Sequence, residues 1–311
     1  MDRILSALKA LGEPTRMRVM ALCAQGDLTV SELVHILGQS QPRVSRHLKL
    51  LCEAGLLQRL REGSWVFHRL APDGEENAFV SKLVEMIPQD DEIILRDRER
   101  LGEIKRERAQ KATEYFGEIA QEWAEIRALH VGDGEVEKIL LDVLSPQPDY
   151  DFLDIGTATG RIMEVFSPHI RQGWGIDLSS EMLSIARANL EKGGFNNCAV
   201  RQGDMYQVPF SGESFDLVTI YQVLHYADEP LRAIIEAARV LRPGGKLAIV
   251  DFAPHEEENL RSQYQHRRLG FSETELSLLC EESGLNISQV RQLPGDPLTV
   301  TIWIAEKKDN N

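Results

Sequence analysis

The sequence predicts an α+β domain at the N-terminus, a helical connector, and an α/β domain at the C-terminus. With 311 residues, of which 42% are hydrophobic, the chain exceeds the size at which a single hydrophobic core usually keeps growing. Near the N-terminus, short helical patterns precede two strand-like runs, whereas beyond residue 150 strand-like runs alternate with helices. We therefore expect domains at residues 1–72 and 131–308, with residues 73–130 as a connector and dimerisation region.

The two predicted domains differ in charge. Residues 1–72 contain ten Lys or Arg and six Asp or Glu, a net charge of +4; the whole chain carries −14, so the remainder carries −18. This asymmetry fits a small module that approaches phosphate groups, attached to a body that phosphate groups repel. Ordinary fluctuation of charge along a chain would give the same counts, so both interpretations stay open.

The chain lacks sequence features of export or membrane insertion. Its first sixteen residues carry charges throughout, and no run approaches the roughly 18 apolar residues of a membrane span. Cys23, Cys52, Cys198 and Cys280 are scattered, so they form neither a local disulfide framework nor a paired metal knuckle. We expect a cytoplasmic protein with reduced cysteines and no membrane partner.

Four short helices are predicted in the first domain. Leucines recur at helical spacing over residues 5–11, and after a break a second apolar run covers residues 17–22. A third helix is indicated over residues 32–37, and a fourth over residues 42–51, where Pro42 is allowed in the first turn.

The fourth predicted helix has an outer face that can contact both base edges and phosphates. This face carries Gln41, Arg43, Ser45, Arg46, His47 and Lys49. Two strands follow, over residues 56–60 and 65–70, joined by a turn that contains Gly63. A basic outer face alone would be typical of any solvated amphipathic helix. Together with the hairpin behind it, the pattern predicts a winged helix-turn-helix that binds double-stranded DNA.

The segments LGEPTRMRVMALC, LTVSELVHILGQSQPRVSRHLKLLCEAGLL and LLQRLREGSWVFHRL resemble the ArsR family of bacterial repressors. The resemblance implies a homodimer built by the first and last helices of the domain, recognition by the fourth helix, and a DNA-contacting wing that contains Arg61. The sequence departs from the family at its metal sites. Residues 31–34 hold no cysteine pair, and residues 75–87 hold no histidine, so we predict no metal site.

The connector combines two helical patterns of different character. Apolar residues over 78–87 suggest a fifth helix before Pro88, and fourteen of the 22 residues from 90 to 111 are charged. We interpret residues 90–111 as a solvated helix rather than a dimer seam, because Asp97 falls where a seam residue should be apolar. Residues 115–127 form an amphipathic pattern that resembles the helix capping the cofactor pocket in many small-molecule methyltransferases, and a simple packing helix would fit as well.

The second domain opens with a strand over residues 150–155, a glycine turn over residues 156–160, and a helix from about residue 161. Such a turn lets backbone N–H groups and a helix N-terminus approach a ligand closely. A second strand ends in Asp177, 21 residues after Gly156, where a carboxylate can accept hydrogen bonds from two ribose hydroxyls. A dinucleotide-binding domain would satisfy these observations equally well.

A third position distinguishes between the two nucleotide folds. Asp204 and Met205 follow the next strand, where the carboxylate can accept the adenine amino group and the thioether can pack on the ring. Further strands are predicted over residues 214–220 and 247–252, near residues 288–292, and over residues 298–306, which gives seven in all.

The segments FLDIGTATGR, GIDLSSEML, GDMYQVPF, SFDLVTIYQVLHY and LRPGGKLAIVDF resemble the class I S-adenosylmethionine-dependent methyltransferases. The resemblance implies a Rossmann-like, seven-stranded methyltransferase fold with strand order 3-2-1-4-5-7-6 and an antiparallel last strand. It implies that S-adenosylmethionine (SAM) or S-adenosylhomocysteine (SAH) is bound by Asp154, Gly156, Thr157, Gly160, Asp177, Leu178, Asp204, Met205 and Gln222. One departure is Ala158, which occupies a loop position that is commonly glycine.

The joined modules predict a transcriptional regulator whose effector is SAM or SAH. In this respect the chain resembles ArsR-type repressors of methionine-cycle genes. The alternative is an active small-molecule methyltransferase with an appended DNA-binding domain, for which His225 is a possible base although a loop histidine is more often structural. Arsenite methylation is disfavoured because it needs grouped thiolates. A third possibility, a vestigial fold used only for dimerisation, predicts no nucleotide binding.

Overall fold

The computed structural model describes residues 2–62, 65–71, 82–84, 86–88, 90–107, 132–260 and 266–308. The chain divides into two compact units, Met1–Gln110 and Lys111–Asn311. The sequence pattern over residues 115–127 and the first part of the pattern over residues 78–87 lie outside the described residues.

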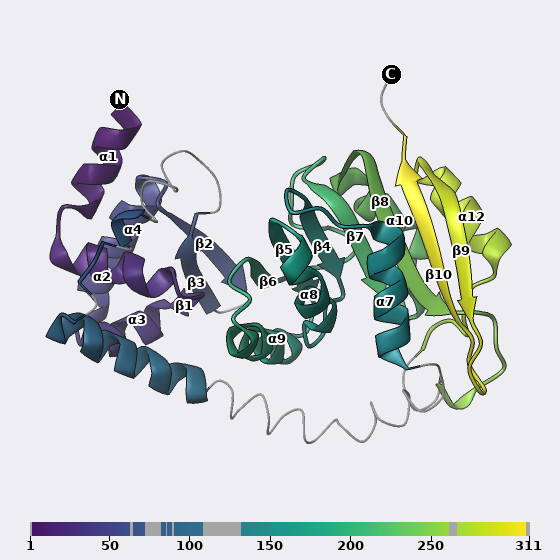
Figure 1. Cartoon of the computed structure of the whole chain (residues 1–311), viewed down its shortest axis with the longest axis horizontal. Coiled ribbons are helices and arrows are strands. Elements are labelled where there is room, and N and C mark those ends of the chain that lie inside the picture. Colours follow the sequence, from purple (N-terminus) through teal and green to yellow (C-terminus); the bar gives the residue numbers. More distant parts are fainter. Residues whose placement is uncertain are drawn as a thin grey trace. The chain divides into compact units, whose positions relative to one another are not determined.

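The first unit opens with four helices whose ends follow from local sequence (Figure 1). They are α1 (Asp2–Leu11), α2 (Pro14–Cys23), α3 (Val30–Leu37) and α4 (Gln41–Glu53). Helix α3 begins with a capping box, in which the Thr29 hydroxyl accepts the Glu32 N–H and the Glu32 carboxylate accepts the Thr29 N–H. It ends at Gly38, whose φ of 64° gives the left-handed cap that glycine adopts without strain. Three residues, Gly38 to Ser40, separate α3 from α4, which fixes a helix-turn-helix.

A three-stranded antiparallel sheet completes the first unit in the order β1-β3-β2. Its strands are β1 (Leu28–Thr29), β2 (Leu57–Glu62) and β3 (Trp65–Leu70). The predicted hairpin is therefore confirmed as β2 and β3, paired in register from Leu57 opposite Leu70 to Glu62 opposite Trp65. Strand β1 was not predicted, because a run of two residues carries no alternation that a sequence pattern could reveal.

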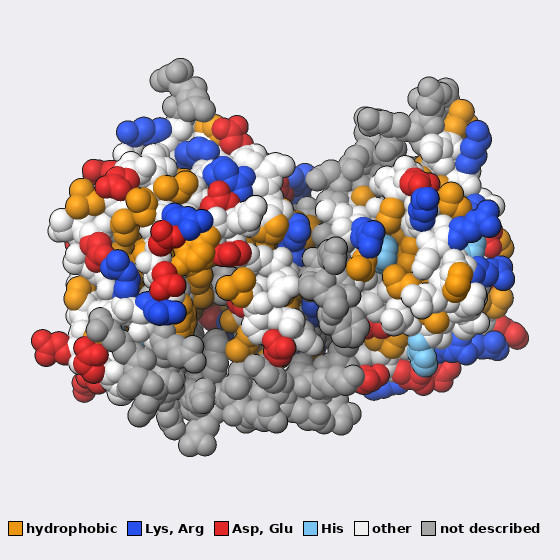
Figure 2. Space-filling view, turned by 180° about the vertical axis from the view of Figure 1, so that it is seen from behind, with side chains coloured by type: hydrophobic (Ala, Val, Ile, Leu, Met, Phe, Trp, Pro, Cys, Tyr) orange, Lys and Arg blue, Asp and Glu red, His pale blue; other side chains and the backbone are white. Residues whose placement is uncertain are grey.

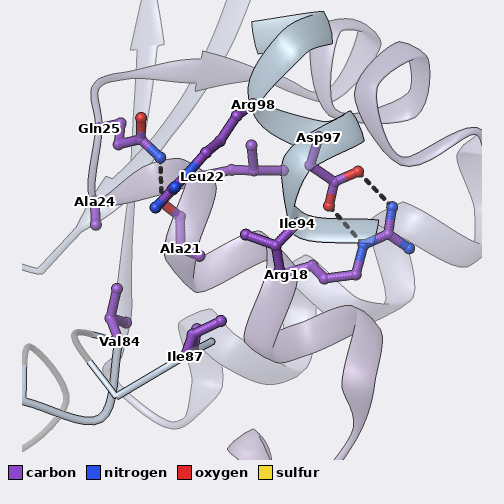
Figure 3. Close-up of a pocket in the computed structure, with 10 residues that line it drawn as sticks. All are labelled: Arg18, Ala21, Leu22, Ala24, Gln25, Val84, Ile87, Ile94, Asp97 and Arg98. Carbon is purple, nitrogen blue, oxygen red and sulfur yellow. Dashed lines mark hydrogen bonds and ion pairs between the residues drawn. The ribbon is translucent and has the colours of Figure 1, made fainter. Parts of the chain in front are cut away.

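A further helix over residues 92–107 packs onto the first unit. Its charge content had predicted a solvated helix, and that prediction was wrong. Leu101 and Ile104 are buried in the core of this unit. Asp97, on the same face, is also buried and accepts two hydrogen bonds of 2.6 Å from the Arg18 guanidinium of α2 (Figure 3). The buried face therefore includes an acid because α2 supplies a bidentate cation.

The second unit contains a seven-stranded sheet with flanking helices. In chain order its elements are α7 (Asp133–Leu144), β4 (Asp151–Ile155), α8 (Arg161–Phe166), η1 (Ser167–His169), β5 (Gln172–Asp177), α9 (Ser180–Gly193), β6 (Cys198–Gln202), β7 (Phe215–Tyr221), η2 (Leu224–Tyr226), α10 (Pro230–Val240), β8 (Leu241–Phe252), α12 (Glu273–Glu282), β9 (Leu285–Leu293) and β10 (Val300–Lys307).

The strand order is β6-β5-β4-β7-β8-β10-β9, which confirms the predicted order 3-2-1-4-5-7-6. Strand β10 pairs antiparallel with both β8 and β9, as predicted for the last strand, while the pairs from β6 to β8 are parallel. The order reverses direction between β4 and β7, so right-handed crossovers place α8 and α9 on one face and α10 on the other. Ligands of such open sheets bind at this reversal, outside the carboxyl ends of the strands.

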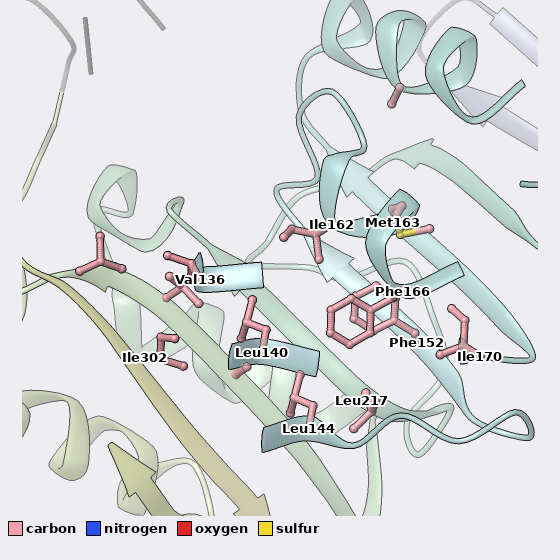
Figure 4. Close-up of a cluster of buried hydrophobic side chains, with 14 of the residues drawn as sticks. Val136, Leu140, Leu144, Phe152, Ile162, Met163, Phe166, Ile170, Leu217 and Ile302 are labelled. Carbon is pink, nitrogen blue, oxygen red and sulfur yellow. The ribbon is translucent and has the colours of Figure 1, made fainter. Parts of the chain in front are cut away.

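The core of the second unit lies between the sheet and the helices α7, α8 and α9 (Figure 4). Val136, Leu140 and Leu144 recur on one face of α7 at intervals of four residues and are all buried. Phe152 of β4 and Phe166 of α8 stack with ring centroids 4.6 Å apart. This packing fixes β4 and the start of α8, and therefore positions the glycine turn between them.

Candidate functional site

The turn between β4 and α8 packs against Val223, which follows the neighbouring strand β7. Gly156 has φ +75°, and a Cβ at this position would lie 2.4 Å from a methyl carbon of Val223. Only glycine satisfies both the backbone conformation and the close approach. The N–H groups of Gly156 and Thr157 donate to the Ile176 carbonyl of β5 at 2.8 and 2.9 Å. The turn is thus attached to the ends of two neighbouring strands.

Asp154 lies inside the sheet at the carboxyl end of β4 and is 1% exposed. Its Oδ1 accepts a hydrogen bond of 2.6 Å from the Thr219 hydroxyl of β7. Burial raises the pKa of this carboxyl group to about 6, and the hydrogen bond from Thr219 opposes the shift. A buried carboxylate whose hydrogen bonds come from hydroxyl groups rather than from a cation is costly to the fold, which is typical of a residue that serves ligand binding.

Asp177 ends β5 and holds the middle of the glycine turn. Its two carboxylate oxygens accept the backbone N–H groups of Ala158 and Ser179, each at 2.9 Å. Burial raises the pKa of Asp177, while these backbone hydrogen bonds lower it. Ala158 has φ +47°, so the turn keeps the left-handed conformation although alanine replaces the usual glycine. The structure therefore brings Asp154, the glycine turn and Asp177 together.

The remaining cofactor candidates surround this turn at the same edge of the sheet. Leu178 is 60% exposed, an unusual exposure for a large apolar side chain beside a buried acid. Asp204 and Met205 are half-buried after β6, and Asp204 lines an open pocket with residues 207–211. Gln222 follows β7 with φ +50°, and its buried side-chain nitrogen has no hydrogen-bond partner among the described residues.

His225 has a partner that the sequence did not reveal. Its Nδ1 lies 2.8 Å from Oδ1 of Asp251, and both side chains are buried. Asp251 is the penultimate residue of β8, 26 positions along the chain. The sequence signal that could have identified this partner was the acid within the apolar run AIVDF. A carboxylate near the carboxyl end of a buried parallel strand often faces a functional site.

Helix α4 presents a mostly exposed polar and basic face on the first unit. Gln41, Arg43, Ser45, Arg46 and Lys49 are all exposed. On the face of this unit at the right of Figure 2, Lys and Arg side chains are distributed with hydrophobic ones between them. A second helix of a helix-turn-helix with exposed Arg and amide side chains can reach base edges and phosphates in a major groove.

His47 is placed differently from the other candidates of α4. Its side chain is 12% exposed, and its Nδ1 lies 3.6 Å from the Glu13 carboxylate at the start of α2. Burial lowers the pKa of His47, and Glu13 opposes the shift. The backbone of Arg61 belongs to β2 of the hairpin, as expected for a wing residue, and its side chain lies outside the described residues.

Two family models match the chain, one in each unit. Residues 13–59 match the bacterial regulatory protein, arsR family, and residues 153–249 match a methyltransferase domain. The chain joins an ArsR-family helix-turn-helix domain to a class I methyltransferase domain. The fold of the second domain implies SAM binding.

Individual relatives resemble one domain or the other. The arsenic resistance transcriptional regulator ArsR1 of Pseudomonas putida is 50% identical over 66 residues, which are 21% of this chain and 52% of the relative. The uncharacterized methyltransferase YcgJ of Bacillus subtilis is 30% identical over 125 residues, 40% of this chain and 49% of the relative. This chain thus spans about half the length of these curated relatives.

Solved structures resemble the methyltransferase domain. The crystal structure of YcgJ superposes with a TM-score of 0.51 at 20% identity and covers 57% of this chain and all of that chain. A similarity at this level of identity demonstrates the fold alone.

The residues of the second domain fit SAM on structural grounds. Asp177 keeps acceptor capacity beside the glycine turn, and the exposed Leu178 offers an apolar surface for an adenine ring. The buried, unpartnered amide nitrogen of Gln222 is a further donor at the same edge. Over the described ranges, no three His, Cys, Asp or Glu side chains group as metal ligands. No helix in the described part of the chain is both long and apolar enough to cross a bilayer.

Proposed function

We propose that the chain is a dimeric transcriptional regulator whose affinity for operator DNA is set by SAM or SAH bound to its methyltransferase domain. The observation that carries the proposal is that one chain combines a basic, exposed α4 with a glycine turn that lies beside Asp154 and Asp177 at one edge of a sheet. The first domain lacks the cysteine pair and histidines that bind metal in its metal-sensing relatives. We therefore assign effector binding to the second domain. We expect the chain in the cytoplasm, where its operator lies.

The proposal assigns a role to each end of the methyltransferase sheet edge. Asp154, Gly156, Thr157 and Gly160 would hold the methionine part of the ligand, with Gln222 beside the sulfur. Asp177 would accept the ribose hydroxyls. Asp204, Met205 and Leu178 would hold the adenine ring. When SAM is bound, it supplies an electrophilic methyl group on a positively charged sulfur, whereas SAH is uncharged at that position.

DNA contact is assigned to α4 and the wing. Gln41, Arg43, Ser45 and Arg46 would contact base edges, with Lys49 and Arg61 on phosphates. We place His47 at the edge of the DNA-binding surface of α4, because its side chain lies against Glu13. A ligand changes DNA affinity only if it binds two states of the protein with different affinities, and couplings of about 1–3 kcal/mol, or roughly 5- to 150-fold, are usual.

Dimerisation is assigned to α1. Ile4, Leu5 and Leu8 are 46%, 45% and 43% exposed on this helix, although all three are large and apolar. Burying them against a second copy would remove this surface from water. Leu8→Glu should therefore shift the chain from dimer to monomer in analytical ultracentrifugation, while the buried Ala7 keeps α1 on its own domain. A wild-type monomer at all concentrations would contradict the dimer.

The test of the proposed function measures both ligands on one protein. An operator is first selected from a random DNA pool with the full chain, and its affinity is then measured by fluorescence anisotropy with SAM, with SAH, and with neither. Asp177→Asn should abolish the ligand effect and leave basal DNA binding unchanged. Arg46→Ala should weaken DNA binding and leave calorimetric SAH binding unchanged. If neither nucleotide changes DNA affinity, the regulatory proposal is refuted.

A second candidate function is methyl transfer by the C-terminal domain. It is favoured by one specific observation, the hydrogen bond between His225 and Asp251, because this bond removes the reason for treating His225 as a loop histidine without a partner. Release of SAH from SAM in the presence of an acceptor distinguishes this function from ligand sensing alone.

A further inference from the structure

A buried imidazole and carboxylate lie together beyond the carboxyl ends of β7 and β8. His225, in the 3-10 turn η2, is 2% exposed, and Asp251 of β8 is fully buried. Besides the bond from the His225 ring, Asp251 accepts the backbone N–H of His225 at 3.0 Å and that of Phe252 at 2.8 Å. Backbone groups of η2 and of the end of β8 therefore hold the pair in a fixed position.

The negative charge of Asp251 has no Lys or Arg partner among the described residues. The backbone N–H groups of Arg267 and Arg268 donate to the His225 carbonyl. Their side chains instead pair with Asp228 and Glu275. Among the described residues, the His225 ring is the side chain that hydrogen-bonds to Asp251.

The hydrogen bond fixes which ring nitrogen is basic. Asp251 accepts the proton on Nδ1, so the neutral imidazole carries its lone pair on Nε2. This nitrogen is buried and makes no hydrogen bond to any described residue. A free lone pair on an imidazole that is backed by a carboxylate is the arrangement that accepts a proton from a reacting group.

Flat rings pack against the His225 imidazole. The ring centroids of His266 and Tyr226 lie 3.9 and 4.2 Å from that of His225, and Phe252 lies at 5.6 Å. Burial and the neighbouring His225 lower the pKa of His266 to about 3, while burial raises the pKa of Tyr226 to about 12. Both rings are thus uncharged near neutral pH. Among the described residues, His266 and Tyr226 are the titratable side chains whose rings lie against His225, whereas the ring of His255 contacts that of Phe252 at 5.9 Å.

We propose that His225 is the proton acceptor in methyl transfer to a phenolic hydroxyl, with Asp251 as its positioning residue. The inference rests on SAM binding at the proposed site. As the methyl–sulfur bond breaks and the oxygen–methyl bond forms, the hydroxyl proton moves to Nε2; the products are a methyl ether, SAH and an imidazolium beside Asp251, which later releases its proton to water. A phenol needs such a base because its pKa is about 10, and its ring matches the flat walls. Since Nε2 is buried, a neighbouring side chain must move for the acceptor to reach it.

The first test reads the ionisation of a bound phenol without any turnover. The full chain is saturated with SAH and titrated with 4-nitrophenol, at a pH where the free probe is un-ionised; the absorption spectrum then distinguishes bound phenolate from bound phenol. We expect phenolate on the wild type and un-ionised phenol on His225→Asn, whose amide can still donate to Asp251. His255→Asn, a histidine of the same region outside the pair, is the matched control and should behave as the wild type.

The second test replaces SAH with SAM and follows loss of the ionisable probe as its methyl ether forms. His225→Asn should lower kcat by about 10²–10⁴-fold with an unchanged KM for SAM. Asp251→Asn should lower kcat less and move the acid limb of the pH profile, an effect that a purely structural role would not produce. Un-ionised probe on the wild type, equal ionisation on His225→Asn, or no probe binding to SAH-loaded protein would each overturn the inference. SAH binding is measured on the same samples by calorimetry; its absence would refute the proposed cofactor site as well.

Discussion

Replacing Asp154 by asparagine should make the methyltransferase domain more stable and its ligand site weaker. Asp154 is buried at the end of β4 and accepts a hydrogen bond from Thr219. Asparagine keeps the size and a carbonyl oxygen for Thr219, but it carries no charge into the sheet. The substitution therefore removes the cost of a buried carboxylate, and with it the group proposed to hold the methionine part of SAM.

The magnitude follows from the shifted pKa. Burial raises the pKa of Asp154 from 3.8 to about 6. Each pKa unit corresponds to about 1.4 kcal/mol, so the ionised carboxylate costs the fold about 3 kcal/mol at pH 7.5. Because the folded-state pKa is the higher one, the wild type regains this stability on acidification through pH 6. The advantage of asparagine should therefore shrink to below about 1 kcal/mol at pH 4.

Urea unfolding of both full-length proteins between pH 4 and 7.5 provides the assay. Trp174 and Trp303 are buried in this domain, so tryptophan fluorescence reports its unfolding. Calorimetry with SAH measures the ligand site in parallel, where we expect at least a tenfold loss of affinity. A variant that is less stable than the wild type at pH 7.5, or more stable by the same amount at every pH, would refute this account of Asp154.

Three further predictions concern other parts of the chain. Because burial and the neighbouring His225 lower the pKa of His266 to about 3, folding stability should be lost as the pH falls from 6.5 toward 3, and His266→Gln should remove this part of the loss in urea unfolding. Asp97→Ala leaves the Arg18 guanidinium without its buried partner and should cost about 3–5 kcal/mol, measured by urea unfolding followed by circular dichroism. Arg46→Ala should lower the slope of log affinity against log salt for operator DNA by about 1, whereas Arg96→Ala, an exposed arginine outside α4, should leave the slope unchanged.

Each of these predictions has a contrary result. Identical acid sensitivity of His266→Gln and wild type would mean that His266 takes up a proton in the folded protein as readily as in the unfolded chain. A loss below about 1 kcal/mol for Asp97→Ala would place its ion pair with the weak surface pairs. Equal salt slopes for the two arginine variants would remove α4 from the DNA interface.

Much of the fold was predictable because it depends on local patterns. Glycine turns, apolar runs and their spacing identified the seven strands, and the adenine position after β6 distinguished the methyltransferase order from a dinucleotide fold. The helix-turn-helix was equally visible, since Gly38 and Pro42 mark its turn within five residues.

What the sequence did not reveal depends on residues far apart in the chain. Arg18 and Asp97 are separated by 79 positions, so Asp97 looked like a polar interruption rather than half of a buried ion pair. His225 and Asp251 meet only because β7 and β8 are neighbours whose carboxyl ends share an edge. His47 has the spacing of an outward residue, and its contact with Glu13 depends on how α2 packs on α4.

The helix over residues 92–107 has an evolutionary consequence. Arg100 donates a 2.8 Å hydrogen bond to the Ile36 carbonyl in the last turn of α3, and a Cβ on Gly38 would lie 3.3 Å from the same guanidinium. Lys105 likewise donates to the Gln25 carbonyl after α2. A gene fusion downstream of this helix adds a new domain after a segment that is already hydrogen-bonded to the last turn of α3 and to the residue after α2. An ancestral single-domain repressor could therefore acquire a new input by recombination, without remodelling the helix that reads DNA.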